Sequence, residues 1–437
     1  MGICPPDETV LRSGDGHLQH LIDGARQHSC FMVCLMPTKA HVESDLKAAG
    51  LLDINAQLSD AIVDEVYYAL YPPVHEGHTP PYGSIVNGLA SSTAPTLDVS
   101  HVSPSIAREI ADGASAFLVR GASLSSSRVY ICDRRLEDER SLLSLAKDVE
   151  GVVVQRNLQG EVRVYTQRGV FASKGPSWEV RPMSDTVVDN VRRVVPQSSS
   201  PILERILEFA FHVLSPNSIG ATLVWWLAGQ PSSVATSLDV SSVGLSVANR
   251  SHYGAIKALV SQHDRAVFLD RDGQLRSINQ HLGNTQRSET IVAEIGGTRH
   301  TSAKRYSFDQ QDALVVVVSE DGPVSIFSDG VKVTELRQAA IGTTRESLVD
   351  MVPEKKDDTF EDIQLIACSN CGKTVVCEVV TVAGWRDRET GECPVCGTTV
   401  CERNCFQINT TIRKVLSGET LDPLIAALRI QLGFDAI

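Results

Sequence analysis

The segment 296–320 reads GGTRHTSAKRYSFDQQDALVVVVSE, and it decides how the middle of the chain folds. Two glycines precede Thr298, Arg299 and His300, and the residues that follow favour a helix. A glycine-rich turn at a helix N-terminus presents free main-chain N–H groups, which favour phosphate binding. The apolar run 313–318 then predicts a buried strand. From this local pattern alone two interpretations stay open, a cradle for a triphosphate and a plain surface turn that caps a helix.

The flanking residues predict that 200–345 forms one layered α/β domain. Apolar residues recur near a 3.6-residue period over 202–214, which indicates an amphipathic helix. Apolar runs over 221–227 and 266–269 predict two further buried strands. The polar turn 271–274 has the character of a hairpin connection. Helices mixed with buried strands in this way indicate packed α and β layers.

This middle segment resembles the diadenylate cyclase domain, the catalytic part of the bacterial cyclic di-AMP synthases. Four blocks carry the resemblance in the family's order, at 220–224, 264–269, 296–303 and 312–320. The first two match an early Gly-Ala-Leu strand and the family's Asp-Gly-Ala motif. The last two match the Gly-Thr-Arg-His-Arg motif and the strand that ends in Ser-Glu-Glu. The resemblance implies a layered domain with a mixed sheet.

Two positions depart from the family pattern. Arg265 stands where the family has the glycine of Asp-Gly-Ala, and Thr301 stands where it has the second arginine of Arg-His-Arg. The second change removes a cation, which Lys304, Arg305 or Arg265 would replace. Sequence does not decide which of these three points towards the nucleotide.

A second placement of the first motif is possible at 253–256, where Tyr-Gly-Ala-Ile keeps the glycine and the alanine. This placement loses the acid and lies further upstream than the family's spacing. We therefore place the motif at Asp264, because a hairpin turn follows its strand at 271–274, as the family requires.

The resemblance implies an enzyme that joins two ATP molecules into cyclic di-AMP and releases pyrophosphate, as a homodimer or higher homo-oligomer. Mg²⁺ or Mn²⁺ would be held by the hard oxygen ligands of Asp264 and Glu320. Arg299 would offset charge on the transferred phosphoryl group, and His300 and Thr298 would bind phosphate oxygens. The implied catalytic residues are Asp264, Arg299, His300 and Glu320, and the implied nucleotide-binding residues are Gly297, Thr298, Arg299, His300, Thr301 and Ser302.

Two other functions remain open because the changed positions lie at the nucleotide. Arg265 and Thr301 would mark either a degenerate domain that binds a nucleotide without turning it over, or a synthase of a different nucleotide product. Analysis of the products made from ATP would separate the three readings.

Four cysteines near the C-terminus predict a structural zinc site. Cys368 and Cys371 form one CxxC pair, and Cys393 and Cys396 form a second pair after 21 intervening residues, a spacing close to that of zinc ribbons. A glycine follows each pair and lets the backbone curl around the sulfurs. Four thiolates leave no open position on the Zn²⁺ ion, so we expect scaffolding or docking rather than catalysis. No partner is assigned to Cys377, Cys401 and Cys405.

Charge opposes nucleic acid as a partner. The chain holds 53 acidic and 40 basic residues, a formal net charge of −13, which disfavours general attraction to phosphate backbones. Acidic residues also flank the cysteines, so a protein is the expected partner of the zinc ribbon.

Polar joints at 196–201 and 353–358 divide the chain into units at 1–197, 200–345 and 360–437. The first unit is expected to be an α/β sensor or regulatory domain, with helices over 61–71 and 105–116 and strands over 116–120, 128–132, 151–154 and 161–165. Its histidines show no metal or triad spacing. The third unit shows almost no core before its cysteines and is expected to close with a helix over 422–432. No apolar run is long enough for a membrane span, and we expect a cytoplasmic location.

Overall fold

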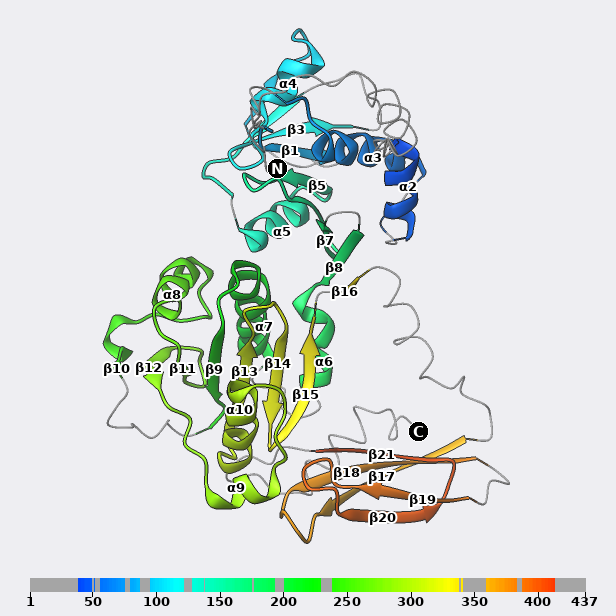
Figure 1. The fold of residues 1–437 in the computed structure, drawn as a ribbon, viewed down its shortest axis with the longest axis vertical. Coiled ribbons are helices and arrows are strands. Elements are labelled where there is room, and N and C mark those ends of the chain that lie inside the picture. Colours follow the sequence, from blue (N-terminus) through cyan, green and yellow to red (C-terminus); the bar gives the residue numbers. More distant parts are fainter. Residues whose placement is uncertain are drawn as a thin grey trace, which may run out of the picture.

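The structure is a computed structural model. It describes residues 38–48, 51, 56–74, 79–86, 95–121, 128–136, 138–174, 177–192, 200–228, 238–337, 339–340, 359–382 and 387–412. Its strands form sheets of nine, seven, three and two strands. Figure 1 shows the nine-stranded sheet at one end, the seven-stranded sheet in the middle and the two small sheets at the other end. The mixed α/β architecture predicted from the sequence is confirmed.

The N-terminal sheet has the strand order β16-β8-β7-β6-β5-β1-β3-β4-β2. Its first eight strands are β1 (Tyr82–Val86), β2 (Thr96–Asp98), β3 (Ala116–Arg120), β4 (Arg128–Ile131), β5 (Val152–Arg156), β6 (Val162–Thr166), β7 (Gly169–Lys174) and β8 (Ser177–Pro182). The helices are α2 (Lys39–Ala48), α3 (Ala56–Leu70), α4 (Pro104–Ile110), α5 (Glu139–Asp148) and, after a 3-10 turn at Ser184–Val187, α6 (Val188–Arg192). The four predicted strands are present as β3 to β6, and β5 and β6 form the expected hairpin.

The helix expected over 105–116 was predicted too long, because α4 ends at Ile110. Asp112 stops it: its carboxylate accepts hydrogen bonds from the main-chain N–H groups of Ala114, Ser115 and Ala116. Gly113 follows with a φ of +69°, a conformation that L side chains disfavour. The chain therefore turns here and enters β3.

Helices cover both faces of the N-terminal sheet. Leu46 of α2 and Val66 of α3 pack on one face, in the same buried cluster as Val154 of β5. Leu142 of α5 packs on the other face with Val153, the neighbour of Val154. Successive strand residues point to opposite faces, so the apolar run in β5 serves two cores.

The middle sheet has the strand order β10-β12-β11-β9-β13-β14-β15. These strands are β9 (Ala221–Trp226), β10 (Leu238–Asp239), β11 (Ala266–Leu269), β12 (Leu275–Gln280), β13 (Ala313–Val318), β14 (Val324–Ser328) and β15 (Val331–Leu336). Its α-helices are α7 (Ser200–Phe209), α8 (Tyr253–Val260), α9 (Gln286–Ile291) and α10 (Thr298–Asp309). The expected helix 202–214 is α7 continued by a π-helix at Ala210–Leu214. The three predicted buried strands are β9, β11 and β13.

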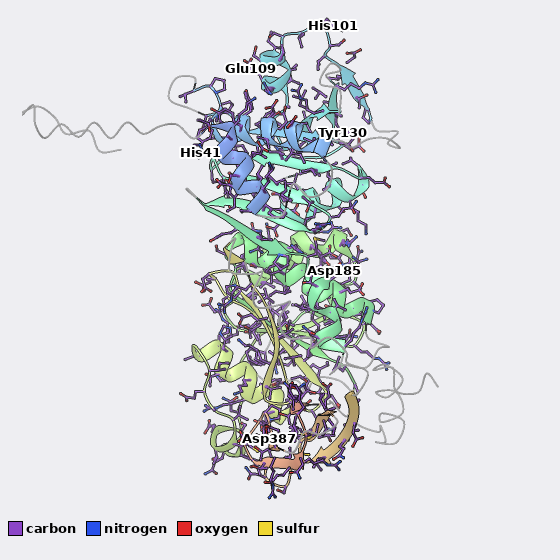
Figure 2. All side chains as sticks on the ribbon, turned by 90° about the vertical axis from the view of Figure 1, so that its right-hand side faces the viewer. His41, His101, Glu109, Tyr130, Asp185 and Asp387 are labelled. Atoms are coloured by element: carbon purple, nitrogen blue, oxygen red, sulfur yellow. The ribbon has the colours of Figure 1, made fainter. Side chains whose placement is uncertain are left out.

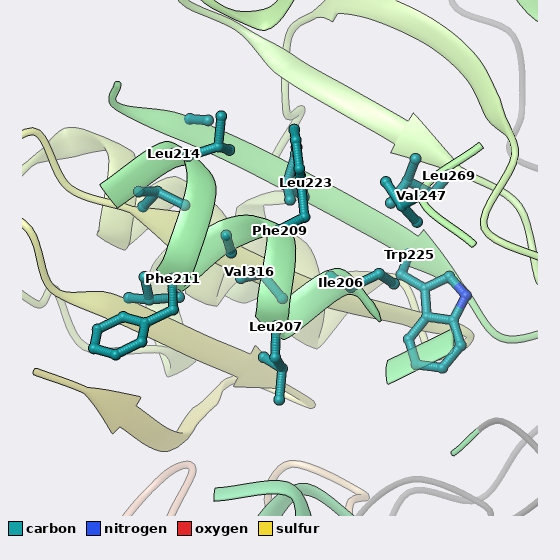
Figure 3. Close-up of a cluster of buried hydrophobic side chains, with 14 of the residues drawn as sticks. Ile206, Leu207, Phe209, Phe211, Leu214, Leu223, Trp225, Val247, Leu269 and Val316 are labelled. Carbon is teal, nitrogen blue, oxygen red and sulfur yellow. The ribbon is translucent and has the colours of Figure 1, made fainter. Parts of the chain in front are cut away.

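The middle sheet also carries a core on each face. Figure 3 shows the first, where α7 and the π-helix place Ile206, Phe209 and Leu214 against side chains such as Leu223 of β9. On the other face Tyr306 of α10 packs with Val315 of β13. All six residues of β13 are buried, as expected for a central strand between two helical layers. Helix α10 is thereby packed against β13, the strand that follows it in the chain.

The unit expected at 200–345 differs from the observed sheet at its end. The middle sheet ends with β15 at Leu336, and β16 (Ala339–Ala340) pairs antiparallel with β8 of the N-terminal sheet. The chain thus returns to the first unit before it reaches the cysteines. At its start, α7 begins at Ser200, inside the joint expected at 196–201.

The C-terminal part contains a three-stranded sheet, β17-β18-β21, and a two-stranded sheet, β19-β20. The strands are β17 (Thr359–Ala367), β18 (Thr374–Val382), β19 (Arg388–Glu392), β20 (Thr399–Asn404) and β21 (Gln407–Ile412). A strand not expected from the sequence, β17, precedes the cysteines and pairs with β18 along its whole length. The joint at 353–358 and the helix expected over 422–432 lie outside the described residues.

Within the described residues, no helix combines the length and apolar character that crossing a membrane requires. Figure 2 shows His101 at the far end of the N-terminal unit and His41 nearer its middle. Both side chains are exposed, and the groups of possible metal ligands found among the described residues include no histidine. The expectation that these two are ordinary histidines fits this placement.

Candidate nucleotide and metal sites

A cleft of about 300 Å³ opens at one end of the middle sheet. It brings together four residues singled out in the sequence, Asp264, Thr298, Arg299 and Ser302, with Arg265 beside them. The remaining lining residues are Thr222, Ala266, Gln280, His281 and Leu282. Polar and charged groups dominate this wall, which suits a hydrophilic ligand rather than an apolar one.

Strand direction explains why these residues meet. β9 and β11 run parallel, so their first residues lie at the same end of the sheet. β12 and β13 run antiparallel to them and finish at that end, with Gln280 opposite Ala266 and Val318 opposite Ala221. Lining residues as far apart in the sequence as Thr222 and Ser302 thereby converge.

Gly220 makes room for two of the predicted catalytic side chains. The Arg299 Nη2 atom lies 3.7 Å from the Glu320 Oε1 atom, and both side chains pass close to Gly220. A Cβ atom on Gly220 would lie 2.3 Å from Arg299 Nη1 and 2.8 Å from Glu320 Cγ. Glu320 is thus held beside Arg299 and does not line the same cleft as Asp264.

The N-terminus of α10 faces the cleft through Thr298 and Arg299. Gly297 is its N-cap and supplies no side-chain hydrogen bond, and Gly296 before it has a φ of +57°. In the first turn of a helix the main-chain N–H groups lack partners within the helix and carry a partial positive charge. This end of α10 therefore has the chemistry to bind an anion.

His300 is not among the residues that line the cleft. Its Nε2 atom lies 3.5 Å from the Ser319 hydroxyl, and its ring makes an edge contact with Phe327. Burial lowers the pKa of His300 below its ordinary value of 6.5, so the ring is neutral at pH 7. The geometry ties His300 to the turn that carries Glu320.

Thr301 closes the loop before α10. Its hydroxyl donates to the Ile295 carbonyl and accepts from the Ile295 N–H. Of the three candidate replacement cations, Lys304 donates to the Ala293 carbonyl and Arg305 to the Val292 carbonyl. Arg265 alone among the three lines the cleft.

The competing placement of the first motif is not supported by the structure. Residues 253–256 begin helix α8, and the Tyr253 hydroxyl donates to the Arg205 carbonyl. None of these residues lines the cleft that Asp264 enters. Asp264, by contrast, lines the cleft.

The cleft includes residues that sequence reasoning missed. Gln280 and His281 follow the expected hairpin turn at the far end of β12. The register of an antiparallel hairpin returns this end to the first residues of β11. Two register shifts in this hairpin, between Ala266 and Phe268 and between Phe268 and Leu269, move the pairing by two residues, so a regular register counted outward from 271–274 would have stopped short of both residues.

The four predicted zinc ligands converge in the C-terminal part. The Sγ atoms of Cys368, Cys371, Cys393 and Cys396 all lie within 4.8 Å of one another. Two of these separations, Cys368 to Cys396 and Cys371 to Cys393, are 3.6 Å. A tetrahedron with Zn–S bonds of about 2.3 Å has S–S edges of about 3.8 Å, so the cluster fits Zn²⁺.

The backbone around the cysteines forms two matching turns. The N–H of Gly372 donates to the Cys368 carbonyl, and the N–H of Gly397 donates to the Cys393 carbonyl, each at 2.8 Å. Both glycines have positive φ values, +76° and +72°. These are the curled backbones that the glycine after each CxxC pair predicts.

The other three cysteines described in this part are buried beside the four-cysteine cluster. Cys377, Cys401 and Cys405 belong to the same cluster of buried residues. Burial raises the pKa of Cys377 to about 11, so this thiol stays protonated at neutral pH. Small buried thiols suffice to explain these side chains.

Comparison with known families assigns two of the three units. Residues 208–332 match the family model described as "DisA bacterial checkpoint controller nucleotide-binding". The middle of the chain is a diadenylate cyclase-type domain. Residues 41–182 match the model described as "Probable sensor domain DACNK". No curated protein matches the chain.

A buried ion cluster joins the sensor domain to the cyclase domain. Glu139 of α5 pairs with Arg181 of β8 at 3.1 Å, and its other oxygen lies 2.9 Å from His212 of the π-helix. Burial alone would raise the pKa of Glu139, but Arg181, His212 and Arg163 outweigh it and lower the pKa. The carboxylate is therefore charged at neutral pH.

The same cluster reaches the turn that carries Glu320. The Arg181 Nη2 atom donates to the Ser215 hydroxyl, which donates to the Gly322 carbonyl of the turn between β13 and β14. A cavity of about 230 Å³ lies beside these residues and is lined by both Glu139 and Glu320. Two hydrogen bonds thus connect the sensor sheet to Gly322, two residues after the catalytic candidate Glu320.

Proposed function

We propose that the chain is a diadenylate cyclase regulated by its N-terminal domain, which converts two ATP molecules into cyclic di-AMP and two pyrophosphates. Each ATP supplies a 3′-hydroxyl that attacks the α-phosphate of the other, and the bond between the α- and β-phosphates breaks. The observation that carries this proposal is the joint presence of Asp264, Arg299 and the open end of α10 at one cleft. Their chemistries suit a metal ion and a polyphosphate.

The N-terminus of α10 would bind the phosphates. Gly297 leaves space for close approach, and the N–H groups of the first turn donate to phosphate oxygens. The hydroxyls of Thr298 and Ser302 line the same wall and would add hydrogen bonds. Together these groups would hold the α-phosphate in line with the attacking hydroxyl.

Arg299 would neutralise charge on the transferred phosphoryl group. Glu320 lies 3.7 Å from the Arg299 guanidinium, and both side chains pass Gly220 at the start of β9. Arg265 lines the same cleft and takes the place of the cation that the family has at position 301. Thr301 and His300 would act indirectly, by closing the loop at Ile295 and by holding the turn at Ser319.

Asp264 suits a divalent metal ion. Its carboxylate is exposed in the cleft, and no described residue donates a hydrogen bond or ion pair to it. Mg²⁺ or Mn²⁺ would neutralise phosphate charge and lower the pKa of the attacking hydroxyl. Glu320 is the second candidate ligand, and it would have to turn from Arg299 to reach the same ion.

The reaction needs two opposed nucleotides, so we propose a homodimer or larger assembly in which two clefts face each other. Zn²⁺ is the structural ion of the four-cysteine cluster. A cytoplasmic location suits both sites, since ATP is present and thiols stay reduced there. A protein partner at the zinc ribbon and the unit boundaries 1–197, 200–345 and 360–437 remain part of the proposal.

Asp264→Asn tests the assignment. This substitution removes a metal-binding charge and nearly preserves shape, so product should disappear while ATP binding is largely kept. Cyclic di-AMP is measured by mass spectrometry and ATP binding by calorimetry. Full activity in Asp264→Asn would overturn the role of Asp264, and ATP binding by the wild type without any product would favour a degenerate nucleotide-binding domain.

A further inference from the structure

The zinc site lies against the cyclase domain and not at a free end of the chain. Figure 1 shows the C-terminal sheets next to α9 and the nearby end of α10. The Arg287 Nη2 atom of α9 donates to the carbonyl of the zinc ligand Cys371 at 2.8 Å. Lys373, two residues after that ligand, donates to the Phe308 carbonyl and to the Asp329 carboxylate, each at 2.9 Å.

The two parts also share one buried core. Val292 and Phe308 of the cyclase domain belong to the same cluster as three of the zinc ligands. The Lys373 ammonium lies 4.9 Å from the centre of the Phe308 ring. At Gly330, which has a φ of +86°, an added Cβ would lie 3.3 Å from Val395 of the second CxxC turn. The C-terminal part therefore packs directly against the cyclase domain.

Val292 begins the loop that leads to the nucleotide site. From Val292 the chain runs through 293–297 and enters α10. Side chains of α10 hold this loop at Val292, Ala293 and Ile295 through Arg305, Lys304 and Thr301. One end of the loop is therefore set by the core around the cysteines, and its other end carries the N-cap Gly297.

Helix α9 contacts both the end of α10 and the turn that carries Cys371. The hydroxyl of its N-cap residue Thr285 and the hydroxyl of Ser288 in its first turn donate to the Asp309 carboxylate at the end of α10. Arg287 lies in that turn as well and reaches Cys371. The zinc-holding turn is thus bonded to both elements that flank the loop 292–297.

We propose that the turn Cys368–Lys373, when closed by Zn²⁺, positions the loop 292–297 and with it the phosphate-binding end of α10. Arg287 and Lys373 are the positioning residues. The binding of ATP at the cleft rests on the proposed function. The positioning of the loop 292–297 by the turn Cys368–Lys373 does not depend on that function. The zinc site then acts on the chain's own nucleotide site, in addition to any external partner.

The test uses the full chain with Arg287→Met and Lys373→Met, and Arg388→Gln as the matched control. Arg388 is a cation of the same zinc-bearing part, but it pairs with Glu402 across β19 and β20. Zinc content, amide hydrogen exchange over 292–300 and the affinity for ATP are measured on each protein. Zinc should stay at one per chain in all three.

Exchange over 292–300 should rise and ATP affinity should fall in both Met variants. In Arg287→Met each should change by about tenfold, the factor expected when one hydrogen bond of a charged group is lost, and in Lys373→Met, which loses two such bonds, each should change by at least that much. The control should match the wild type. Wild-type exchange over 292–300 in Arg287→Met, with zinc retained, would overturn the proposal. Lys373→Met leaves the buried Asp329 carboxylate without the Lys373 ammonium, and this variant could fail to fold. The exchange measurement on Arg287→Met then decides the proposal by itself. A wild type that binds no ATP would instead refute the proposed function, and the exchange data would still decide whether the zinc site supports the loop.

Discussion

Arg181 Nη2 donates a hydrogen bond to the Phe211 carbonyl at 2.6 Å, and this bond ties the sensor sheet to the π-helix of the cyclase domain. The guanidinium also stacks over the Phe211 ring, 4.4 Å from its centre. Arg181 and its partner Glu139 are both buried, so the pair lies at the junction and away from solvent. Buried pairs of this kind are costly to break on one side.

Glu139→Gln should destabilise the protein by about 3 kcal/mol at neutral pH, because it leaves Arg181 and Arg163 buried without their shared carboxylate. The pKa of Glu139 is lowered in the folded state. Its contribution is therefore complete above the ordinary pKa of 4.5 and is lost as the pH falls through the lower folded value. Urea unfolding at pH 7 and at acid pH measures this difference. An equal gap between Glu139→Gln and wild type at both pH values would contradict the coupling.

Gly220→Ala should impair catalysis without destabilising the fold. The added methyl group would displace the ends of Arg299 and Glu320, which are flexible side chains, so the melting temperature should change little. The rate of product formation should fall by about a hundredfold, as misplacement of a catalytic group by about 1 Å commonly causes. Thermal melting and product assays on the same preparation provide the comparison, and an active Gly220→Ala protein would argue against Arg299 as a catalytic residue.

Cys393→Ser should remove Zn²⁺ and unfold 359–412, because metal binding and folding are one equilibrium in small zinc modules. The sensor and cyclase sheets should stay folded, since each has its own buried clusters. Metal analysis and limited proteolysis test this. Much less than one zinc per wild-type chain, in the absence of chelators, would show that the four-cysteine site is wrongly assigned.

The sequence predicted the central strands and the acid of the cleft because these depend on local patterns. The apolar run of β13 and the hairpin after Asp264 both follow from neighbouring residues. The inward position of Arg265 and the inward turn of Thr301 towards Ile295 depend on the path of the loop 292–297. No local pattern reports that path.

The contacts between units were also beyond sequence reasoning. Glu139 and His212 are 73 positions apart, and Arg287 and Cys371 are 84 positions apart. Each residue alone looks like an ordinary surface charge or zinc ligand. Only the packed sheets show that the sensor domain reaches the Glu320 turn and that the four-cysteine site reaches α9.

A shared site predicts a dominant effect of inactive chains. Asp264→Asn protein is mixed with wild type at rising ratios, and cyclic product is followed after subunit exchange is demonstrated. If two facing clefts hold the two ATP molecules, activity should decline more steeply than the fraction of wild-type chains, and activity per chain should fall on dilution. Strict proportionality to wild-type chains would place the whole reaction within one protomer.

The identity of the product tests the central claim most directly. The purified protein is incubated with Mn²⁺ and each of the four ribonucleoside triphosphates in turn, and the products are identified by mass spectrometry. We predict cyclic di-AMP and pyrophosphate in a ratio of one to two from ATP, and loss of both in the Asp264→Asn protein. A different product from ATP, or none at any protein concentration from a chain that binds ATP, would contradict the assignment as a diadenylate cyclase.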